Sequence, residues 1–360
     1  MRRYIKKREA ERFNELIYKA QNVLIISHTS PDGDAVGSVT AMQNYLNCLK
    51  INSSVVLPNR YPDYLEFLDT KTSIKFFSTD HKRTLESIDN SDLIIVLDFN
   101  QLSRIDELGS YIANTSVPKI LIDHHPSPEK DVFDLVISNT EVSSTCELLY
   151  WLISLLEEQK SEILTIEGVV LESINSCDLT LDVAESLYVG MMSDTNNFAN
   201  SVSSATLLMA SRLIDNGVDK EKLQNLVFGG FGENRMRLMG HMLLNKMVIL
   251  KKYNAGFIML SKEDQERFNY SDGDSDGFVN MPLNIKGVFV SALFTEKKDE
   301  IRVSLRSSNN FSVNNFSKLH FNGGGHERAA GGKLNIKFDM VADYFLAALE
   351  KSYNECFNNN

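Results

Sequence analysis

Short apolar runs alternate with amphipathic stretches through the first 216 residues of the chain. Runs without polar interruption are typical of parallel strands that are covered on both faces. Such runs occupy residues 23–27, 53–57, 93–98 and 119–123. Helical periodicity is found at residues 35–49, 144–157, 161–173, 183–194 and 204–216. The alternation predicts a doubly wound α/β domain with a mainly parallel sheet.

The pattern changes after residue 216. Residues 217–250 contain three glycines between positions 229 and 232 and then a Met-rich helical stretch, and we interpret them as a connector. Residues 251–350 predict a second, smaller α+β domain that includes a helix over residues 340–353. Its predicted strands are residues 255–261, 288–295, 301–307 and 333–338.

The overall charge limits the kind of partner. The formal net charge is −11 at pH 7. Proteins that grip long duplex nucleic acid present basic surfaces, because their affinity comes largely from neutralising phosphates. The acidic balance therefore argues against a long nucleic-acid track. It leaves room for a small phosphate ester in a pocket where metal ions dominate the local field.

The cysteines and the hydropathy favour an intracellular, non-membrane protein. The four cysteines are far apart and form no CxxC pair, so neither a disulfide framework nor a zinc ribbon is expected. No apolar run approaches the roughly 18–20 residues that a membrane-spanning helix needs. We therefore expect a soluble cytoplasmic protein whose thiols are reduced.

Candidate chemistry gathers where the predicted strands end. In open parallel sheets, ligands bind outside the carboxyl ends of the strands. A helical run that ends near residue 194 supplies a further carboxylate. The imidazoles and carboxylates at these ends are His28, Asp32, Asp34, Asp98, Asp123, His124, His125 and Asp194.

These residues favour a metal centre over isolated structural roles. A single Asp at a strand end usually caps a helix or starts a turn. Enrichment of Asp and His at three strand ends and one helix end makes that explanation improbable for the whole set. Mixed His and Asp ligands suit Mn²⁺ better than Ca²⁺ or Mg²⁺ alone. So many carboxylates favour two ions, because without cations they would repel one another.

The motifs resemble those of a known family. Asp123-His124-His125 matches the motif that names the DHH phosphoesterases. The segment from His28 to Ser38, then Asp98, then Asp194-Thr195, match its other motifs in the same order. The resemblance covers roughly residues 10–350 and implies that residues 1–216 are the catalytic, metal-binding DHH domain.

The second domain resembles the first type of DHH-associated domain. Its signature is a glycine-rich loop that ends in histidine, with an Arg-Ser pair upstream. The resemblance implies substrate-binding roles for the matching residues, with the glycines as a backbone cradle for a phosphate or base. These residues are Arg306, Ser307, Gly323, Gly324, Gly325 and His326, followed by Ala329-Ala330-Gly331-Gly332.

The resemblance also implies how the first-domain residues divide their roles. One ion would be held by His28, Asp32 and Asp98. The other would be held by the set Asp34, Asp98, His124 and Asp194, so that Asp98 bridges the two ions. Such a pair supports in-line attack of hydroxide on phosphorus. Asp123 is expected to orient a metal-binding histidine from outside, and His125 to face the substrate phosphate or, alternatively, to be structural.

The family subgroup implied is the stand-alone one of nanoRNase type. It includes oligoribonucleases that also hydrolyse 3′-phosphoadenosine 5′-phosphate (pAp), and phosphodiesterases of cyclic di-AMP or pApA. We expect a hydrolase of phosphoester bonds that acts on short oligoribonucleotides and pAp with two Mn²⁺ ions, Mg²⁺ or another divalent ion being the alternative. Whether two copies form a homodimer stays open.

Three other functions compete with this one. A cyclic di-AMP phosphodiesterase is the runner-up. An exopolyphosphatase or pyrophosphatase is disfavoured, because related pyrophosphatases lack the glycine-rich loop of the second domain. A non-catalytic nucleotide-binding regulator would have lost a metal ligand, and every expected ligand position is filled.

Two stretches leave details open. After Asp194-Thr195 the family often has a glycine and then a basic residue after phenylalanine, whereas this chain has Asn196-Asn197-Phe198-Ala199. A basic substrate contact is therefore absent from that position. Ser143-Ser144-Thr145, ahead of Glu147, fits either a helix N-cap or a small polar stretch near the site.

Overall fold

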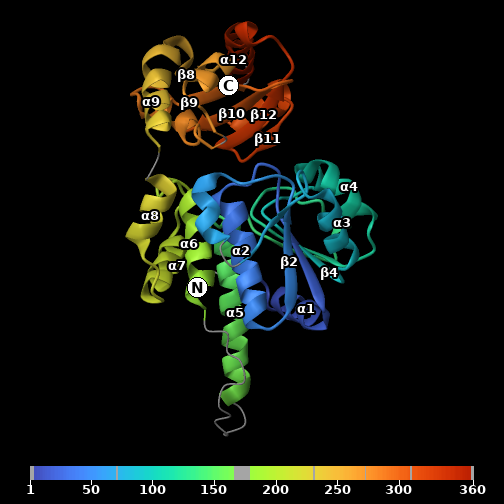
Figure 1. The fold of residues 1–360 in the computed structure, drawn as a ribbon. Coiled ribbons are helices and arrows are strands. Elements are labelled where there is room, and N and C mark those ends of the chain that lie inside the picture. Colours follow the sequence, from blue (N-terminus) through green and yellow to red (C-terminus); the bar gives the residue numbers. More distant parts are fainter. Residues whose placement is uncertain are drawn as a thin grey trace. The chain divides into compact units, whose positions relative to one another are not determined.

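A computed structural model describes residues 4–69, 72–165, 179–229, 232–271, 273–308 and 310–357. The chain divides into two compact units, Met1–Gly230 and Phe231–Asn360, called here the first and the second unit (Figure 1). The division falls inside the segment 217–250 that was interpreted as a connector. Each unit has its own apolar core.

The first unit is built on a parallel sheet, as predicted. Among its described residues, six parallel strands follow the order β3-β2-β1-β4-β5-β6. The strands are β1 (Asn22–Ile26), β2 (Asn52–Leu57), β3 (Lys75–Phe76), β4 (Leu93–Leu97), β5 (Lys119–Asp123) and β6 (Leu135–Ser138). Neither β3 nor β6 was predicted. β3 has two residues and β6 has four, and in β6 only alternate residues are buried.

Helices cover both faces of this sheet, which confirms the doubly wound class. Ile25 and Ile95 pack into the cluster that contains residues of α2 and α5, whereas Leu24 and Ile94 pack into the cluster that contains residues of α3 and α4 (Figure 1). The helices of this unit are α1 (Lys7–Lys19), α2 (Gly33–Cys48), α3 (His81–Asp89), α4 (Asp106–Asn114), α5 (Thr145–Thr165), α6 (Leu181–Asp194), α7 (Ser204–Asp215) and α8 (Lys220–Phe228). Short 3₁₀ turns are η1 (Asp63–Leu68), η2 (Leu102–Ile105) and η3 (Lys130–Val132).

One helix prediction was wrong in its boundary. Separate helices were expected over residues 144–157 and 161–173, but α5 continues without a break to Thr165. The polar residues 157–160 include neither Gly nor Pro, and Glu, Gln and Lys are good helix formers, so nothing there ends the helix. The rest of the second predicted helix, residues 166–173, lies outside the described residues.

Helices α2 and α6 pack closely because glycines face the contact. A Cβ added at Gly37 would lie 2.6 Å from the Ser186 carbonyl oxygen. A Cβ at Gly190 would lie 2.2 Å from Cys146 Sγ and 2.7 Å from Asp34 Oδ1. Only residues without a Cβ allow the two helix backbones to approach this closely.

The second unit is a mixed sheet with helices, in agreement with the predicted α+β class. Among its described residues the strand order is β11-β12-β10-β9-β8-β7, with β8 and β9 parallel and the other pairs antiparallel. The strands are β7 (Met247–Leu250), β8 (Ala255–Leu260), β9 (Val290–Glu296), β10 (Ile301–Ser307), β11 (Gly324–Gly325) and β12 (Ala329–Leu334). The helices are α9 (Glu233–His241), α10 (Lys262–Arg267), α11 (Val313–His320) and α12 (Val341–Phe357), with a π-helical turn at η4 (Met242–Lys246) and 3₁₀ turns at η5 (Lys251–Tyr253), η6 (Phe278–Asn284) and η7 (Phe338–Met340).

The last predicted strand was misplaced by four residues. It was expected at 333–338, but β12 spans Ala329–Leu334 and pairs along its whole length with β10. The residues 329–332 are small and glycine-rich, a composition typical of loops. In the structure their small size allows close approach of the segment before β11, since a Cβ at Gly332 would lie 2.4 Å from the Phe321 carbonyl oxygen.

Membrane crossing finds no support in the helices. Among the helices that the structure describes, none combines the length and the apolar character needed to span a bilayer.

The glycine contact predicts a selective loss of stability. Gly190→Ala is expected to lower the free energy of unfolding by about 1–3 kcal/mol, the usual cost of overpacking. Unfolding in denaturant measures this free energy. The matched control is Gly240→Ala in α9, where an added Cβ meets nothing within 4 Å. That control should be neutral or slightly stabilising, because Ala is the better helix former. Equal unfolding curves for Gly190→Ala and the natural chain would refute the close contact.

Candidate metal centre

The predicted imidazoles and carboxylates gather at one edge of the first unit's sheet. His28 lies two residues after β1, and Asp98 directly follows β4. Asp123 is the last residue of β5 and is followed by His124 and His125. Since β1, β4 and β5 are neighbouring parallel strands, their carboxyl ends meet at the same edge.

Two helices bring the remaining carboxylates to this edge. Asp32 is the N-cap of α2, and its side chain accepts hydrogen bonds from the backbone N–H groups of Asp34 (3.0 Å) and Ala35 (3.1 Å). Asp34 lies in the first turn of α2, and Asp194 is the last residue of α6. The cap that starts α2 therefore also fixes where Asp32 and Asp34 stand.

The distances form two overlapping groups. Ligand atoms of His28, Asp32 and Asp98 lie within 4.8 Å of one another, and so do those of Asp34, Asp98 and His124. Asp194 joins the second group, since its Oδ2 lies 3.1 Å from His124 Nε2. Asp98 belongs to both groups, which is the position that a bridging carboxylate must have.

The tautomer of His28 suits a metal ligand. Its Nδ1 lies 3.0 Å from the Thr29 carbonyl oxygen and donates to it, which leaves Nε2 as the basic nitrogen, 3.3 Å from Asp98 Oδ2. Burial is the largest influence on this imidazole and lowers the pKa of His28, although the charge of Asp32 opposes it. The neutral ring that results is the form that binds metals.

The carboxylates are crowded, and crowding shifts their titration. Burial, followed by the charge of Asp194, raises the pKa of Asp34 to about 7. Burial, followed by the charge of Asp34, raises the pKa of Asp98 well above its usual value. Burial lowers the pKa of His124, but the hydrogen bond and charge of Asp194 outweigh it and the pKa rises to about 9. Acids this close cannot all ionise unless cations neutralise them, so the donor set fits divalent metal ions.

Asp98 is held in a strained backbone conformation. Its φ is 65°, in the left-handed region that residues other than Gly, Asn and Asp seldom adopt. The Asp98 N–H donates to the Ile122 carbonyl oxygen (3.2 Å), and the Thr145 hydroxyl donates to Asp98 Oδ1 (2.9 Å). Such strain, maintained by surrounding contacts at a strand end, is typical of functional sites.

Asp123 orients a different histidine from the one expected. A metal-binding histidine was the expected partner, but Asp123 Oδ1 lies 2.7 Å from Nδ1 of His125. His125 lies in the bend that follows β5, from which its ring reaches back to the carboxylate of Asp123. Burial acts to raise the pKa of Asp123, but the hydrogen bond and charge of His125 outweigh it, so the pKa is lowered.

Sequence reasoning missed the contribution of the start of α5. The backbone N–H groups of Thr145 and Cys146 donate to Asp34 Oδ2 (2.7 Å) and Oδ1 (3.0 Å). The available signal in the sequence was the small polar stretch before α5, which fits two interpretations: a helix N-cap or a position near the site. Arg104 was also missed: its carbonyl oxygen accepts from the Thr29 N–H (2.9 Å), and its charge helps to lower the pKa of His28.

In the second unit, the predicted substrate-binding residues meet at one end of β12. Arg306 of β10 is paired with Ala329 of β12, and the Ala329 carbonyl oxygen accepts from the His326 N–H (2.7 Å). Arg306 is half-buried, and its Nη1 donates to the Leu305 carbonyl oxygen (3.0 Å). The Ser307 hydroxyl donates to the Phe311 carbonyl oxygen (2.7 Å).

The glycines at Gly323–Gly325 allow close contact with β12. Gly324 and Gly325 pair with Gly331 and Ala330 across the β11–β12 ladder. Gly325 has a φ of 146°, and its N–H donates to Asn314 Oδ1 (3.2 Å). This amide is therefore already bonded within the unit. The substrate-binding roles of the glycine-rich loop stay predictions.

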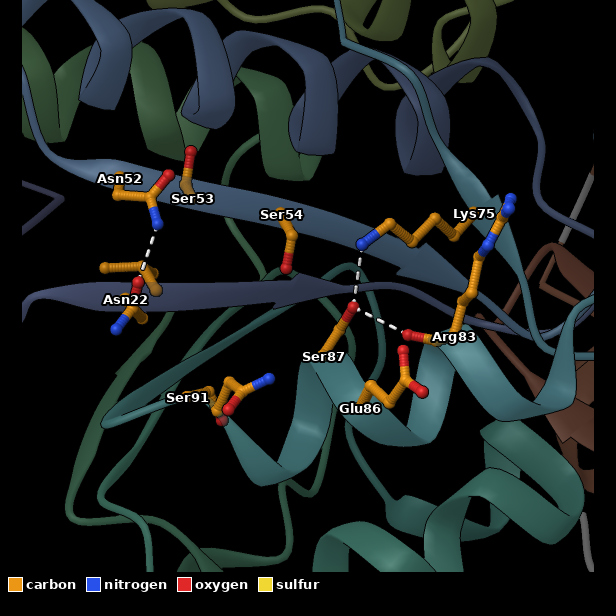
Figure 2. A pocket seen from close by; sticks show the side chains of 11 residues that line it. Asn22, Asn52, Ser53, Ser54, Lys75, Arg83, Glu86, Ser87 and Ser91 are labelled. Atoms are coloured by element: carbon orange, nitrogen blue, oxygen red, sulfur yellow. Dashed lines mark hydrogen bonds between the residues drawn. The ribbon is translucent and has the colours of Figure 1, made fainter.

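A polar hollow lies at the opposite edge of the first unit's sheet and is separate from the candidate metal centre. Its volume is about 610 Å³, and its lining includes Asn22 and Asn52 at the amino ends of β1 and β2. Figure 2 shows Lys75 directed at Ser87, whose hydroxyl it reaches at 2.8 Å. None of the predicted metal ligands lines this hollow.

Two family models match the two units. The model described as DHH family, N-terminal domain, matches residues 22–191, and the DHHA1 domain model matches residues 249–354. The first match contains every predicted metal ligand except Asp194, which lies just beyond its end. The second contains Arg306 and the Gly323–Gly325 loop with His326.

Known proteins resemble the chain over nearly its whole length. The bifunctional oligoribonuclease and PAP phosphatase NrnA of Bacillus subtilis is 28% identical over 335 residues, covering 91% of this chain and 93% of that protein. Its namesake from Thermus thermophilus is 25% identical over 334 residues, covering 91% and 89%.

Solved structures agree with the fold. The crystal structure of an exopolyphosphatase-related protein from Bacteroides fragilis has a TM-score of 0.87 and 36% sequence identity, and covers 98% of both chains. The structure of RecJ with Mn²⁺ from Thermus thermophilus has a TM-score of 0.53 at 14% identity and covers 96% of this chain and 54% of RecJ, which indicates a shared fold. The chain therefore belongs to the DHH family of metal-dependent phosphoesterases, with a DHHA1 domain after its DHH domain.

Proposed function

We propose that this protein hydrolyses short oligoribonucleotides of the pApA type and 3′-phosphoadenosine 5′-phosphate, using two Mn²⁺ ions. The observation that carries the proposal is the pair of ligand groups that share Asp98. The name of the Bacillus subtilis relative supports the substrate class, because the similarity extends over about nine-tenths of both chains (91% and 93%).

In this proposal the ligand groups divide as the sequence motifs suggest. His28, Asp32 and Asp98 would hold one cation. The second would be held by Asp34, Asp98, His124 and Asp194. Divalent cations in such a site polarise the phosphoryl oxygens and neutralise the charge that develops on them. The chain's own contribution is to hold these side chains in place, since Asp34 and Asp98 both accept hydrogen bonds from the start of α5.

His125 is proposed to act on the substrate phosphate. Its Nδ1 is tied to Asp123 Oδ1, which fixes the orientation of the ring. The carboxylate of Asp123 is ionised, because the pKa of Asp123 is lowered, and it therefore accepts a hydrogen bond from His125 Nδ1. The Nε2 side of the ring is then directed to the substrate phosphate in this proposal.

The second unit is proposed to bind the rest of the substrate. Arg306 offers a planar donor group that matches a phosphate, and Ser307 and His326 lie at the same end of the sheet. The loop of Gly323, Gly324 and Gly325 gives this end its shape through close strand contact. These roles rest on the resemblance and on the arrangement within the second unit.

A second candidate function has one specific observation in its favour. The Bacteroides fragilis protein with the same fold is described as exopolyphosphatase-related. Hydrolysis of phosphoanhydride bonds needs the same kind of metal centre, so polyphosphate or pyrophosphate competes with the nucleotide substrates. Cyclic di-AMP is the third alternative. Mg²⁺ in place of Mn²⁺, a cytoplasmic location and a homodimer stay predictions from the sequence.

The substrate proposal predicts a ranking. With Mn²⁺ present, kcat/KM should be highest for pApA and pAp, lower for a five-residue RNA, and lowest for pyrophosphate. The release of mononucleotide or phosphate from each of these substrates, and from cyclic di-AMP, gives the kcat/KM values. Fastest turnover of cyclic di-AMP would favour a signalling phosphodiesterase, and turnover of pyrophosphate alone would overturn the nucleotide proposal.

The shared carboxylate predicts the effect of Asp98→Asn. Asn tolerates the positive φ at this position and keeps the side-chain volume, so the fold should survive while the charge is lost. We expect kcat/KM to fall by more than about 100-fold, since even outer partners of metal ligands cost about 10–100-fold. Asp98→Ala is the poorer variant, because it combines ligand loss with backbone strain.

Circular dichroism checks the fold of Asp98→Asn, and calorimetric Mn²⁺ binding checks the site. Mn²⁺ binding equal to that of the natural chain would exclude Asp98 as the bridging ligand.

The titration of the cluster predicts the pH dependence of metal binding. Because the pKa of Asp34 is about 7 and that of His124 about 9, His124 is protonated and Asp34 is partly protonated near neutral pH when no cation is bound. Cations must displace these protons, so Mn²⁺ affinity should rise as the pH increases from 6 to 8. Calorimetry in buffers of different ionisation enthalpy counts the protons released. Binding without proton release would contradict this charge arrangement.

A further inference from the structure

A buried carboxylate stands next to the candidate metal centre without belonging to it. Glu147 lies in the first turn of α5 and is 0% exposed. Its Oε2 accepts hydrogen bonds from the Ser143 N–H (2.9 Å), the Ser143 hydroxyl (2.6 Å) and the Thr206 hydroxyl (2.9 Å). Its Oε1 accepts from the indole N–H of Trp151 (3.3 Å).

Neutral groups bind this carboxylate: among the described residues, every hydrogen-bond donor to it is uncharged. Burying a carboxylate is costly unless its oxygens are fully bonded, and here they are. The donors come from the segment before α5, from α5 itself and from the first turns of α7, so one side chain joins three parts of the unit.

The turn that Glu147 joins is the one that holds two proposed metal ligands. The first free N–H groups of α5, those of Thr145 and Cys146, donate to the two oxygens of Asp34. The next, that of Glu147, donates to the hydroxyl of the N-cap residue Ser144 (3.0 Å). The Thr145 hydroxyl in the same turn donates to Asp98 Oδ1. Thr145 and Cys146 at the helix start thus donate to Asp34 and Asp98, which lie far away in the sequence.

We propose that Glu147 is a positioning residue, which fixes the first turn of α5 and thereby orients Asp34 and Asp98 for cation binding. This inference rests on the proposed metal centre. Ser143 is bonded to Glu147 through both its backbone and its hydroxyl, so the chain entering α5 cannot turn without breaking two bonds. The bond to Thr206 anchors the same turn to α7.

A purely structural role is the competing explanation, and the two roles differ in what they predict for metal binding. A structural brace would change the free energy of unfolding and leave the folded protein's Mn²⁺ affinity unchanged. A positioning residue changes the affinity of the folded protein itself, because misplaced Asp34 and Asp98 bind a cation less well.

The test is Glu147→Gln, which keeps the volume of the side chain. An amide N–H₂ replaces one acceptor oxygen, so it must face either the Trp151 N–H or the Ser143 and Thr206 donors. We expect the Kd for Mn²⁺, measured by calorimetry on the folded protein, to rise about 10–100-fold. The KM of the enzyme for Mn²⁺ should rise in parallel.

The matched control is Asp69→Asn in the same unit. Asp69 accepts from the Tyr61 hydroxyl (2.7 Å), the Thr72 hydroxyl (2.6 Å) and the Ile74 N–H (2.9 Å). It has hydroxyl and backbone donors as Glu147 does, but none of them bonds a proposed metal ligand. The control should lower the unfolding midpoint and leave the Kd for Mn²⁺ unchanged.

Thr206→Val covers the case in which Glu147→Gln does not fold, because it removes one donor and keeps the carboxylate. A several-fold rise in its Kd supports the inference, and an unchanged Kd overturns it. If Glu147→Gln folds and binds Mn²⁺ like the natural chain while Asp98→Asn does not bind, the positioning role is wrong. If Asp98→Asn also binds normally, the metal centre itself is wrong.

Discussion

Mutual repulsion among buried carboxylates is the constraint around which the first unit is arranged. Asp34 is fully buried and Asp98 nearly so. Burial raises the pKa of both, and the charges of Asp194 and Asp34 add to this effect on Asp34 and Asp98, respectively. Gathering such groups opposes folding unless something compensates for their charge. The chain supplies part of the compensation itself through the amides of α5 and the hydroxyl of Thr145, and cations supply the rest. The acidity that limits stability is therefore the same property that attracts the metal.

The fold of the first unit holds these side chains on the ends of regular secondary-structure elements. Parallel strands deliver His28, Asp98 and Asp123 to one edge on rigid backbone, and the capped start of α2 adds Asp32 and Asp34. Glycine contacts let α2, α5 and α6 approach closely enough for amides to reach a carboxylate. Packing and electrostatics are thus coupled: the residue that permits helix contact, Gly190, also borders Asp34 and Cys146.

The second unit depends on close contact between strands. It uses small residues to bring β11 against β12, and this contact brings Arg306 and His326 to one end of the sheet. The Gly325 N–H already donates to Asn314 Oδ1, so the proposed recognition of a phosphate relies on side chains such as that of Arg306.

The sequence alone determined the parallel sheet, the edge that carries the chemistry and the identity of the clustered side chains. It could do so because apolar runs, strand ends and local motifs are properties of neighbouring residues, as the match of β5 (Lys119–Asp123) illustrates. Only the tertiary structure decided which histidine Asp123 orients, that α5 donates its amides to Asp34 across more than a hundred residues, and that Glu147 joins α5 to α7. These contacts link positions distant in the chain, and local pattern carries no information about which distant donor a buried carboxylate will meet.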